Sequence, residues 1–467
     1  MFLSFVLPTF AAQIFLKFQT SMDHQEQWNK LLSSKRFGNE DFHDSRIQDR
    51  SEFQRDYDRL IFSSPFRRLQ NKTQVFPLPG SVFVHNRLTH SLEVSSVGRS
   101  LGLTTSKFLK EKYHIVENEL LTEIGPIVSA ACLAHDLGNP PFGHSGEKTI
   151  STFFSEGNGQ KWISNLSLSE RSDFCHFEGN ANAFRLLTHT FNGRRPGGFA
   201  LTYSTLASVV KYPYASTFTS EEHPKFGFFS SEAKSFELIA EELGLIRDSE
   251  TFLSYKRHPL VYLVEAADDI CYQIMDMEDA HKLKLITTDE IKALFLNFFS
   301  ETRLTRIHET LSLVEDLNEQ ISYLRSCVIG RLINACAKVF DENESTILDG
   351  TFSGTLIEKM DEQACLAYKA CANISLQKIY HSSDVLDIEL AGHKIINALL
   401  EEVISAVNYP ERAYSKILLA RIPQQYEIKS KTLYGRIQSA LDYISGMTDI
   451  YALDLYQKIN GTSLPVI

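Results

Sequence analysis

The sequence predicts an all-α protein. Apolar residues recur at spacings of three and four over long segments, and alternating β-branched stretches are few. Clusters of Pro and Gly separate these segments and mark the connections between helices. Hydrophobic content of 43% and charged content of 22% are ordinary for a globular protein. We therefore expect a helical bundle with additional C-terminal helices and a loop-rich insert.

The helical periodicity divides the chain into long segments. They are 87–112, 120–137, 231–246, 259–285, 289–299, 305–340, 355–380, 383–407 and 433–457. Turn residues cluster at 75–82, at 138–143 and through 192–229, and the last stretch predicts the loop-rich insert. A change near residue 300 suggests three parts: an N-terminal extension of uncertain status (1–25), a core (26–300) and a helical region (301–467). We expect the last to pack on the core and in subunit contacts.

The first residues allow three interpretations. MFLSFVLPTFAAQIFLKF is apolar up to Lys17, but it lacks the basic start and the small-residue cleavage site of a signal sequence. It is also short for a membrane span. The charged stretch after Met22 favours translation from that methionine. No later segment resembles a membrane helix, so we expect no stable membrane association.

The cysteines indicate the cellular compartment of the protein, and the net charge indicates which partners it can bind. Seven cysteines are scattered without a CxxC pair, which is typical of reduced thiols in a cytoplasmic protein. The formal net charge of -11 argues against a broad nucleic-acid surface, although it leaves room for local basic patches.

Three ionisable residues occupy positions that the periodicity assigns to the core. His90, His135 and Asp268 each share a helical face with Val, Ala, Leu, Cys or Met residues. One histidine on an apolar face is usually a core residue with a satisfied hydrogen bond. A buried carboxylate is harder to explain, because it costs several kcal/mol unless it is paired or protonated.

The pair His135-Asp136 comes where a helix ends. Adjacent helical residues diverge by about 100°, so both can reach one ion only at a helix end or across a narrow helical groove. Pro140 disfavours helix at Asn139 and supplies that end. Two histidines and two aspartates form a mixed nitrogen and oxygen set that suits a divalent metal ion. The pattern by itself leaves a metal site and satisfied core residues equally open.

Seven longer sequence motifs carry a family resemblance. They are RRLQNKTQVF (67–76), NRLTHSLEV (86–94), LAHDLGNPPFGHSGE (133–147), FEGNANAFRLL (177–187), VKYP (210–213), EAADDICYQIMDMEDA (265–280) and DYISGMTDIYALDLYQ (442–457). In this order they resemble the deoxyguanosine triphosphate triphosphohydrolases, a family of HD-domain metal-dependent phosphohydrolases. The extreme N-terminus and much of 300–430 match nothing in that family that we can name.

The resemblance implies an HD-domain helical bundle around a metal ion. It implies hydrolysis of deoxynucleoside triphosphates, with dGTP favoured, to deoxynucleoside and tripolyphosphate. His90, His135, Asp136 and Asp268 would then hold one divalent ion per subunit, Mn²⁺ or Mg²⁺, with other transition ions open.

The resemblance also implies a proton-transfer pair. His144 would move a proton at the α-phosphate and the 5′-oxygen, and Glu147 would orient it. The alternative is that Glu147 merely caps the helix that begins after Ser145 and Gly146.

Substrate contacts follow in the same way. Arg87 and Lys211 would bind phosphate oxygens, and an apolar wall at the sugar would reject a 2′-hydroxyl. The remaining expected contacts are Gln74, Val75, Tyr212, Tyr272 and Asp276, with His176 and Asn180 as looser candidates. For Tyr272 the alternative is core packing, and for Asn180 it is a turn. Arg194 and Arg195 are interpreted as solvated loop charges.

Other functions stay open at this point. A different HD-domain enzyme acting on nucleoside monophosphates or cyclic nucleotides is one alternative, although the Gly-Tyr-Pro word of the cyclic-dinucleotide branch is missing. A non-catalytic nucleotide sensor is another, although every matched metal and proton-transfer position is intact. Family members form homo-oligomers, often hexamers, and some respond to nucleotide or single-stranded DNA effectors, so we expect self-association and allow for an effector.

Overall fold

The computed structural model describes residues 24–40, 50–76, 84–115, 119–249 and 251–463. Within these ranges the chain forms α-helices, short 3₁₀ turns, one π-helical turn and isolated β-bridges, and it forms no strand. The predicted all-α class is therefore confirmed. Almost all of the predicted extension 1–25 lies outside the described residues.

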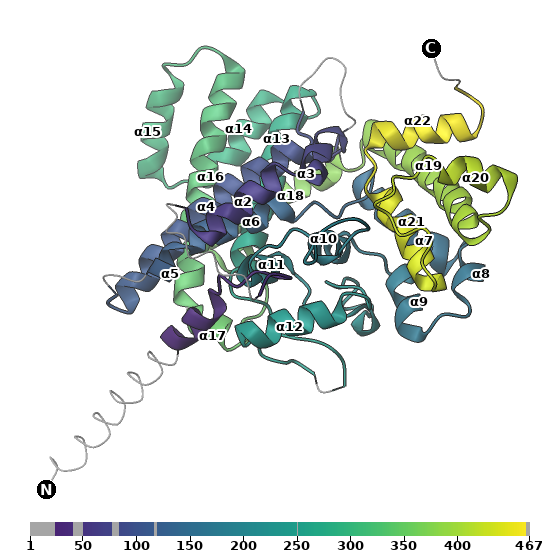
Figure 1. Ribbon diagram of the computed structural model, residues 1–467. Helices are drawn as coiled ribbons and strands as arrows, with labels where there is room; N and C mark the ends of the chain where they lie inside the picture. Colours follow the sequence, from purple (N-terminus) through teal and green to yellow (C-terminus); the bar gives the residue numbers. More distant parts are fainter. Residues whose placement is uncertain (1–23, 41–49, 77–83, 116–118, 250, 464–467) are drawn as a thin grey trace, which may run out of the picture.

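The helices form two groups, with α10 (Gly179–Thr188) between them (Figure 1). The first group comprises α2 (Glu52–Ile61), α3 (Ser64–Arg68), α4 (Arg87–Lys112), α5 (Glu119–Thr122), α6 (Ile124–Ala134), α11 (Tyr203–Val209), α12 (Ala233–Leu243), α13 (Val261–Lys282), α14 (Thr288–Leu296), α15 (Glu301–Leu311), α16 (Leu317–Glu342), α17 (Glu344–Leu348) and α18 (Glu362–Ile374). The second group comprises α7 (Gly143–Ser155), α8 (Gln160–Ile163), α9 (Leu168–Cys175), α19 (Ser383–Asn408), α20 (Ala413–Leu419), α21 (Leu433–Ser445) and α22 (Asp449–Ile459).

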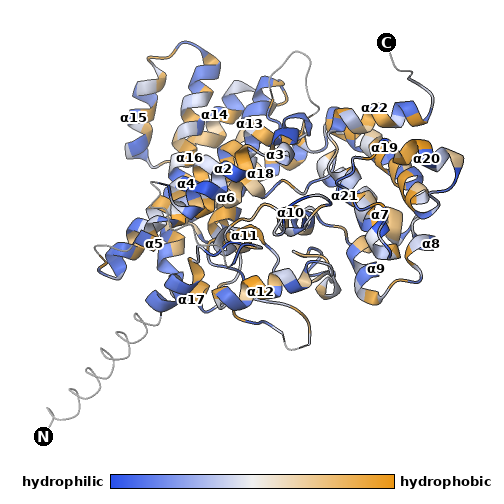
Figure 2. Ribbon diagram, in the orientation of Figure 1, coloured by the Kyte–Doolittle hydropathy of each residue, from blue (hydrophilic) through white to orange (hydrophobic). Residues whose placement is uncertain are grey.

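Each group has its own hydrophobic core. In the first, α4, α6 and α13 pack together, and the buried face of α4 includes Val94 and Leu101 as its periodicity predicts. Helix α6 is buried on every side, since each of its residues from Ile127 to Ala134 is inaccessible or nearly so. Figure 2 shows the hydrophobic colour gathered around α6 and α16. Helix α6 is thus the centre of the first core.

The two cores do not divide the chain at residue 300. The first core continues through α14, α16 and α18 as far as Val385. The second joins α7 and α9 to α19, α21 and α22, which lie more than 200 residues later in the sequence. A segment that directly follows His135-Asp136 therefore packs on the C-terminal helices, because its apolar residues Ile150, Phe153 and Phe154 find their partners there.

Several predicted helices are split in the structure, and two of them are clear examples. The segment 305–340 becomes α15 and α16, and Asp316 caps α16 by accepting the N–H of Glu319 at 2.8 Å. The segment 433–457 becomes α21 and α22, with Thr448 as the N-cap of α22. Both caps are side chains that favour helix starts, and they restart the chain in a new direction.

The loop-rich insert at 192–229 contains little regular structure. It holds α11 and a 3₁₀ turn at Ser216–Phe218, and its remaining residues lie in turns, bends, isolated bridges and irregular segments. In the described residues, no helix is both long enough and apolar enough to cross a membrane.

Candidate active site

Three helices bring two histidines and an aspartate together in the first core. His90 comes from α4, His135 from the end of α6 and Asp268 from α13. One ligand atom from each lies within 4.8 Å of the others. The Nε2 atoms of His90 and His135 lie 3.0 and 3.5 Å from Oδ1 of Asp268. The three positions that the sequence pattern assigns to apolar faces therefore share one site.

The chemistry of this cluster fits a divalent metal ion. Nδ1 of His135 lies 2.6 Å from the carbonyl oxygen of Cys132, so its hydrogen bond places the ring proton on Nδ1. The Nε2 lone pair then faces the cluster, where that atom is buried and has no hydrogen-bond partner. A buried polar atom without a partner costs free energy that a bound cation would remove. The His-His-Asp cluster can thus hold a divalent ion.

Asp136, the fourth predicted ligand, lies at the edge of this cluster. Its Oδ1 is 3.7 Å from Nε2 of His135 and accepts a 2.5 Å hydrogen bond from the amide of Asn139. Its Oδ2 accepts a 2.7 Å hydrogen bond from Arg87. Burial raises the pKa of Asp136, but the Arg87 guanidinium and the neighbouring histidines outweigh it and lower that pKa to about 2. Asp136 is therefore an ionised carboxylate beside the ion site.

The turn after Asp136 depends on backbone conformations that favour glycine. Phe142 and Gly143 both have positive φ, at 63° and 56°. A Cβ on Gly143 would collide with the Arg87 guanidinium, and one on Gly138 would collide with the backbone of α10. The two glycines thus let the turn approach Arg87 and α10 closely, which places α7 directly after the cluster.

His144 and Glu147 form a hydrogen-bonded pair at the start of α7. Nδ1 of His144 lies 2.8 Å from Oε2 of Glu147. The histidine side chain is 73% exposed, whereas that of Glu147 is 11% exposed. The hydrogen bond and charge of Glu147 raise the pKa of His144 above its ordinary value. An accessible imidazole is thus oriented by a buried carboxylate, as a proton carrier requires.

Glu147 does not cap the helix that contains it. It lies inside α7, and its Oε1 accepts a 2.9 Å hydrogen bond from the N–H of Gly179, the first residue of α10. Burial raises the pKa of Glu147, but the bond to His144 and the charges of Lys225 and Arg87 outweigh it and lower that pKa. Arg87 therefore acts on both Asp136 and Glu147, and it connects the ion cluster to the proton-transfer pair.

Lys211 and Tyr212 lie close to α13. Nζ of Lys211 is 3.1 Å from Oε1 of Glu265, whose other oxygen lies 3.0 Å from Nη1 of Arg257. Burial lowers the pKa of Lys211, but Glu265 outweighs it and raises that pKa. Both cations also lie near the ring of Tyr212, at 5.8 and 5.9 Å from its centroid. Glu265, one turn before Asp268, thus positions two cations near the cluster.

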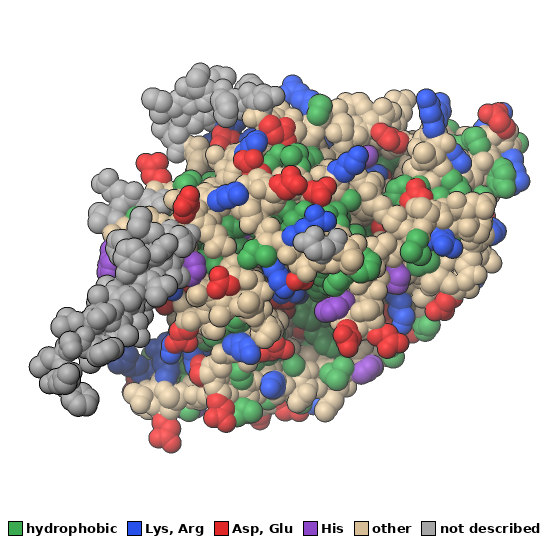
Figure 3. All heavy atoms as spheres, turned by 90° about the horizontal axis from the view of Figure 1, so that it is seen from below, with side chains coloured by type: hydrophobic (Ala, Val, Ile, Leu, Met, Phe, Trp, Pro, Cys, Tyr) green, Lys and Arg blue, Asp and Glu red, His purple; other side chains and the backbone are tan. Residues whose placement is uncertain are grey.

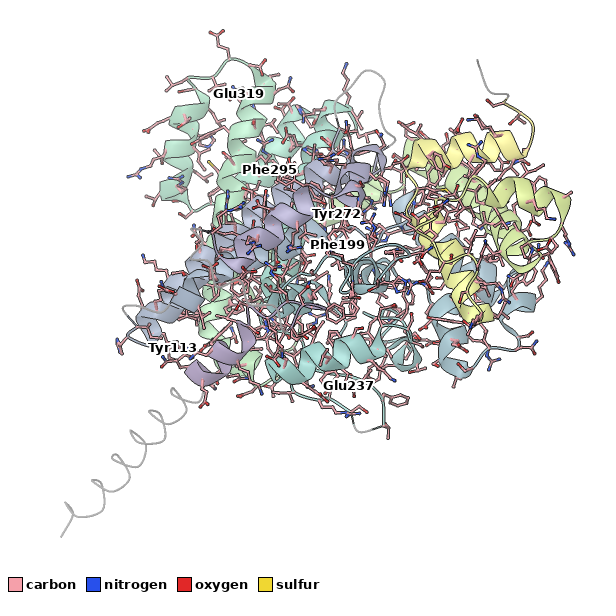
Figure 4. All side chains as sticks on the ribbon, in the orientation of Figure 1. Tyr113, Phe199, Glu237, Tyr272, Phe295 and Glu319 are labelled. Atoms are coloured by element: carbon pink, nitrogen blue, oxygen red, sulfur yellow. The ribbon has the colours of Figure 1, made fainter. Side chains whose placement is uncertain are left out.

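Tyr272 and Asp276 follow Asp268 along α13 and meet Tyr380 from a distant segment. The rings of Tyr272 and Tyr380 stack at 5.9 Å, and the hydroxyl of Tyr380 donates to Oδ2 of Asp276 at 3.0 Å. Tyr380 follows a π-helical turn at Ser375–Ile379, and such turns are frequent at functional sites. Figure 4 labels Tyr272 near the middle of the molecule. Tyr272 therefore stacks on another ring of the site.

Gln74 and Val75 are half-buried after the 3₁₀ turn that follows α3. Oε1 of Gln74 is buried without a hydrogen-bond partner, and Val75 packs against the first core. The N–H of Thr73, just before them, donates to Asp449 at 2.8 Å. A C-terminal helix thus fixes the segment that presents Gln74 and Val75.

His176 and Asn180 make local hydrogen bonds. His176 is exposed at the end of α9, and its Nδ1 contacts Ser172, one turn earlier. The amide of Asn180 donates to Glu178 at 2.6 Å. The structure gives neither residue a hydrogen bond to the metal cluster or to the His144–Glu147 pair.

Sequence reasoning missed five residues that organise the site. They are Asn139, Lys225, Glu265, Tyr380 and Asp449. Tyr380 lies in a part of the chain where no family motif was found, so the sequence offered no signal for it. Glu265, Asn139 and Asp449 lie inside matched motifs, and a search for buried polar positions beside the predicted ligands would have found them.

Figure 3 shows histidines and side chains of both charges around a hollow in one face of the molecule.

Comparison with known proteins agrees with this geometry. Residues 359–458 match the model of the phosphohydrolase-associated domain. The chain is 37% identical over 448 residues to a deoxyguanosinetriphosphate triphosphohydrolase-like protein of Pseudomonas aeruginosa, covering 94% of this chain and 99% of that one. It is 38% identical over 464 residues to a protein of the same description in Synechocystis, at 94% and 100% coverage. A deoxyguanosinetriphosphate triphosphohydrolase of Yersinia enterocolitica is 28% identical over 480 residues, at 87% and 93% coverage.

An all-α fold around a partly buried His-His-Asp cluster defines this protein as an HD-domain phosphohydrolase. Within that class, the chain belongs to the family of deoxyguanosinetriphosphate triphosphohydrolase-like proteins, because the identity extends over nearly its whole length.

Proposed function

We propose that the protein hydrolyses deoxynucleoside triphosphates, dGTP preferentially, to deoxynucleoside and tripolyphosphate. The observation that carries this proposal is the position of Tyr272, Asp276 and Tyr380. Tyr272 and Asp276 lie one and two helical turns after Asp268 on α13. Tyr380 stacks on the first and donates a hydrogen bond to the second. An aromatic surface beside a buried carboxylate suits a sugar with a free 3′-hydroxyl. The names of the relatives agree with this substrate class.

His90, His135, Asp136 and Asp268 are the residues that would hold the ion. When bound, a divalent ion supplies Lewis-acid polarisation of a phosphate oxygen and lowers the pKa of bound water. Two imidazoles among the donors favour Mn²⁺ or another transition ion, and the two carboxylates also suit Mg²⁺.

His144 transfers a proton at the bond that is hydrolysed, which joins the α-phosphorus to the 5′-oxygen. Water adds to phosphorus, and the departing 5′-oxygen needs a proton. Glu147 accepts the Nδ1 proton of His144 in a hydrogen bond, so Nε2 is the nitrogen free to exchange a proton with substrate. The raised pKa of His144 increases the fraction that is protonated near neutral pH, which suits an acid for this oxygen.

The triphosphate needs cations, and the site offers several. Lys211 and Arg257 share Glu265, and Lys225 lies 3.6 Å from Glu178 and acts on the charges of both His144 and Glu147. Each of these cations is already oriented by a carboxylate, which reduces the entropy lost when it contacts a phosphate oxygen. Nη1 of Arg87 donates a hydrogen bond to Asp136, whereas its buried Nε has no hydrogen-bond partner.

Selection for deoxyribose follows from Gln74 and Val75. An apolar side chain at the sugar would leave a 2′-hydroxyl without a hydrogen-bond partner, whereas it tolerates a 2′-hydrogen. The unpaired Oε1 of Gln74 offers one acceptor to a donor on the ligand.

The test is a substrate panel. The purified protein is incubated with Mn²⁺ and each of the four dNTPs, the four rNTPs or dGMP, and ³¹P NMR identifies the products. We expect tripolyphosphate from dNTPs, most rapidly from dGTP, and little product from rNTPs. Orthophosphate from dGMP without tripolyphosphate from any dNTP would instead indicate a monophosphatase.

We also propose that the protein self-associates. Support comes from leucines on α18 and α19 that are strongly exposed, with Leu366 at 61% and Leu390 at 71%. Light scattering coupled to size-exclusion chromatography measures the oligomer, and repeating it with nucleotides or single-stranded DNA tests for an effector.

A further inference from the structure

A polar cavity lies apart from the ion cluster, between α3 and the C-terminal helices. Its volume is about 290 Å³, and Arg68, Lys72, Arg194, Gln425, Tyr426 and Asp442 contribute to its wall. Phe199, labelled in Figure 4, also lines it. None of the predicted metal, proton-transfer or substrate residues does so. The cavity is therefore distinct from the candidate active site.

Three cations converge on this cavity without a carboxylate partner. Lys72 is buried, and its Nζ donates only to the backbone carbonyls of Asn139 and Ser445, at 2.5 and 2.8 Å. Arg194 donates to the side-chain oxygen of Gln425 at 3.2 Å. Among the described residues, no carboxylate forms an ion pair with Arg68, Lys72 or Arg194. Arg194 is exposed, whereas Lys72 is buried and Arg68 is partly buried, and cations in such positions normally have a carboxylate partner.

The one acidic residue in the wall is already neutralised. Both oxygens of Asp442 accept hydrogen bonds from Arg185, at 2.7 Å from Nε and 2.8 Å from Nη2. A bidentate pair of this kind leaves little charge for the cavity. The cavity is therefore positively charged, in a chain whose formal net charge is -11.

These cations repel one another. Burial and the nearby charge of Arg68 lower the pKa of Lys72 to about 7. Burial also lowers the pKa of Arg68, and the charge of Arg194 lowers it further. A bound anion would relieve this repulsion and would restore the ionised state of Lys72.

We propose that this cavity binds a phosphate group. Guanidinium groups match the geometry of phosphate oxygens, and Lys72 adds a point charge at the buried end. An adjoining cavity of about 370 Å³ shares Arg68 and Tyr426 and adds Tyr443 and Tyr451 to its wall. The group can thus belong to inorganic phosphate or to a phosphate ester that carries an aromatic ring.

Two hydrogen bonds connect this cavity to the ion cluster. Lys72 holds the carbonyl of Asn139, and the side-chain amide of Asn139 donates to Asp136. A phosphate that keeps Lys72 charged strengthens the first of these bonds. Occupancy of the cavity therefore stabilises the turn at residues 138–143.

Calorimetric titration with inorganic phosphate and with phenyl phosphate tests the proposal and distinguishes the two sources. We expect Arg68→Gln to raise the Kd about tenfold or more, since a hydrogen bond between charged groups is lost. The matched control is Arg195→Gln, because Arg195 is the exposed neighbour of Arg194 and does not line this cavity. Tighter binding of phenyl phosphate would identify an aromatic ester.

Two further measurements do not depend on catalysis, and the first of them needs no variant. A crystal soaked with tungstate should show anomalous scattering between Arg68 and Lys72. Hydrogen exchange at residues 138–143 should slow with phosphate in the wild type and not in Arg68→Gln. Equal phosphate affinity in Arg68→Gln and wild type, or no tungstate in the cavity, would overturn the proposal. Neither readout uses turnover, so failure of the proposed function would leave both unchanged.

Discussion

Asp449 accepts a hydrogen bond from the backbone N–H of Phe142 at 2.9 Å, although 307 residues separate the two in the sequence. The other oxygen of the same carboxylate accepts the N–H of Thr73 at 2.8 Å. One buried side chain at the start of α22 thus holds the turn that follows His135-Asp136 and the segment that leads to Gln74. The C-terminal helices are therefore part of the site's framework.

Replacement of Asp449 should destabilise the protein and loosen the site. Asp449→Ala leaves two backbone N–H groups without an acceptor, and we expect a loss of about 3–5 kcal/mol, since hydrogen bonds to charged groups contribute about 1.5–3 kcal/mol each. Urea unfolding measures the loss. The control is Asp454→Ala on the same helix, a partly exposed residue paired with Lys458, which should cost about 0.5 kcal/mol or less. Equal losses for both variants would contradict this interpretation.

Metal binding should depend on Asp268 and not on its neighbour Asp269. Asp268→Asn removes the oxygen that faces both histidines, so we expect the bound-ion content to fall from about one per chain to nearly zero. Elemental analysis after dialysis against Mn²⁺ measures it. Asp269→Asn changes the adjacent carboxylate, which is outside the His-His-Asp cluster, and should retain the ion. Loss of the ion in both variants would argue against the cluster as the site.

His144 should matter for turnover, whereas His176 should not. We expect His144→Ala to lower kcat by about 10²–10⁴, the usual contribution of a positioned proton carrier. His176 is also exposed, but it bonds only to Ser172 in its own helix, so His176→Ala is the matched control and should change kcat less than about twofold. Steady-state kinetics with dGTP measures both. A similar decrease in the two variants would remove His144 from its assigned role.

His85 should make stability depend on pH. It lies between Asp279 and Glu93, at 2.8 and 3.0 Å. Burial lowers the pKa of His85, but the hydrogen bonds to Asp279 and Glu93 outweigh it and raise that pKa to about 10. Because the folded pKa exceeds the unfolded one, the stabilisation is complete below about pH 6.5 and is lost as pH rises toward 10.

The measurement compares the Tm of wild type with that of His85→Gln from pH 6 to pH 10. We expect the largest difference near pH 6 and a steady decrease toward pH 10. Replacement of an exposed histidine, His308→Gln, should give no such trend. A difference that grows with pH would show that His85 is neutral in the folded protein.

Tyr380 should contribute to substrate affinity through its hydroxyl. Tyr380→Phe keeps the stacking on Tyr272 but leaves Asp276 without its 3.0 Å donor. Burial raises the pKa of Asp276 well above its ordinary value, so the bond is not one to a fully charged group. We expect KM for dGTP to rise about two- to tenfold with a smaller change in kcat, since a hydrogen bond between neutral groups is worth about 0.5–1.5 kcal/mol. The control Tyr262→Phe removes a longer contact to the backbone of Phe352 and should leave KM unchanged. No change in KM for Tyr380→Phe would exclude a sugar contact there.

Helix positions were predicted well wherever the apolar period was long. The predicted segments 87–112 and 383–407 agree with α4 and α19 to within one residue. Short helices such as α9, α10 and α11 were missed because glycines, serines and polar residues interrupt their period. The breaks at Asp316 and Thr448 were also missed, since a cap within an apolar pattern is a weak signal.

The sequence by itself determined the fold class, the family and the identity of the candidate ligands, because helical period and short motifs are local properties. The tertiary structure decided how those residues are held. Glu147 bonds to Gly179, Asp136 to Arg87 and Asn139, and Asp449 to Thr73 and Phe142. These partners come from distant segments, and only the packing of the two cores brings them within hydrogen-bond distance. The same packing brings Arg68, Lys72 and Arg194 to the wall of one cavity, which no spacing along the chain could indicate.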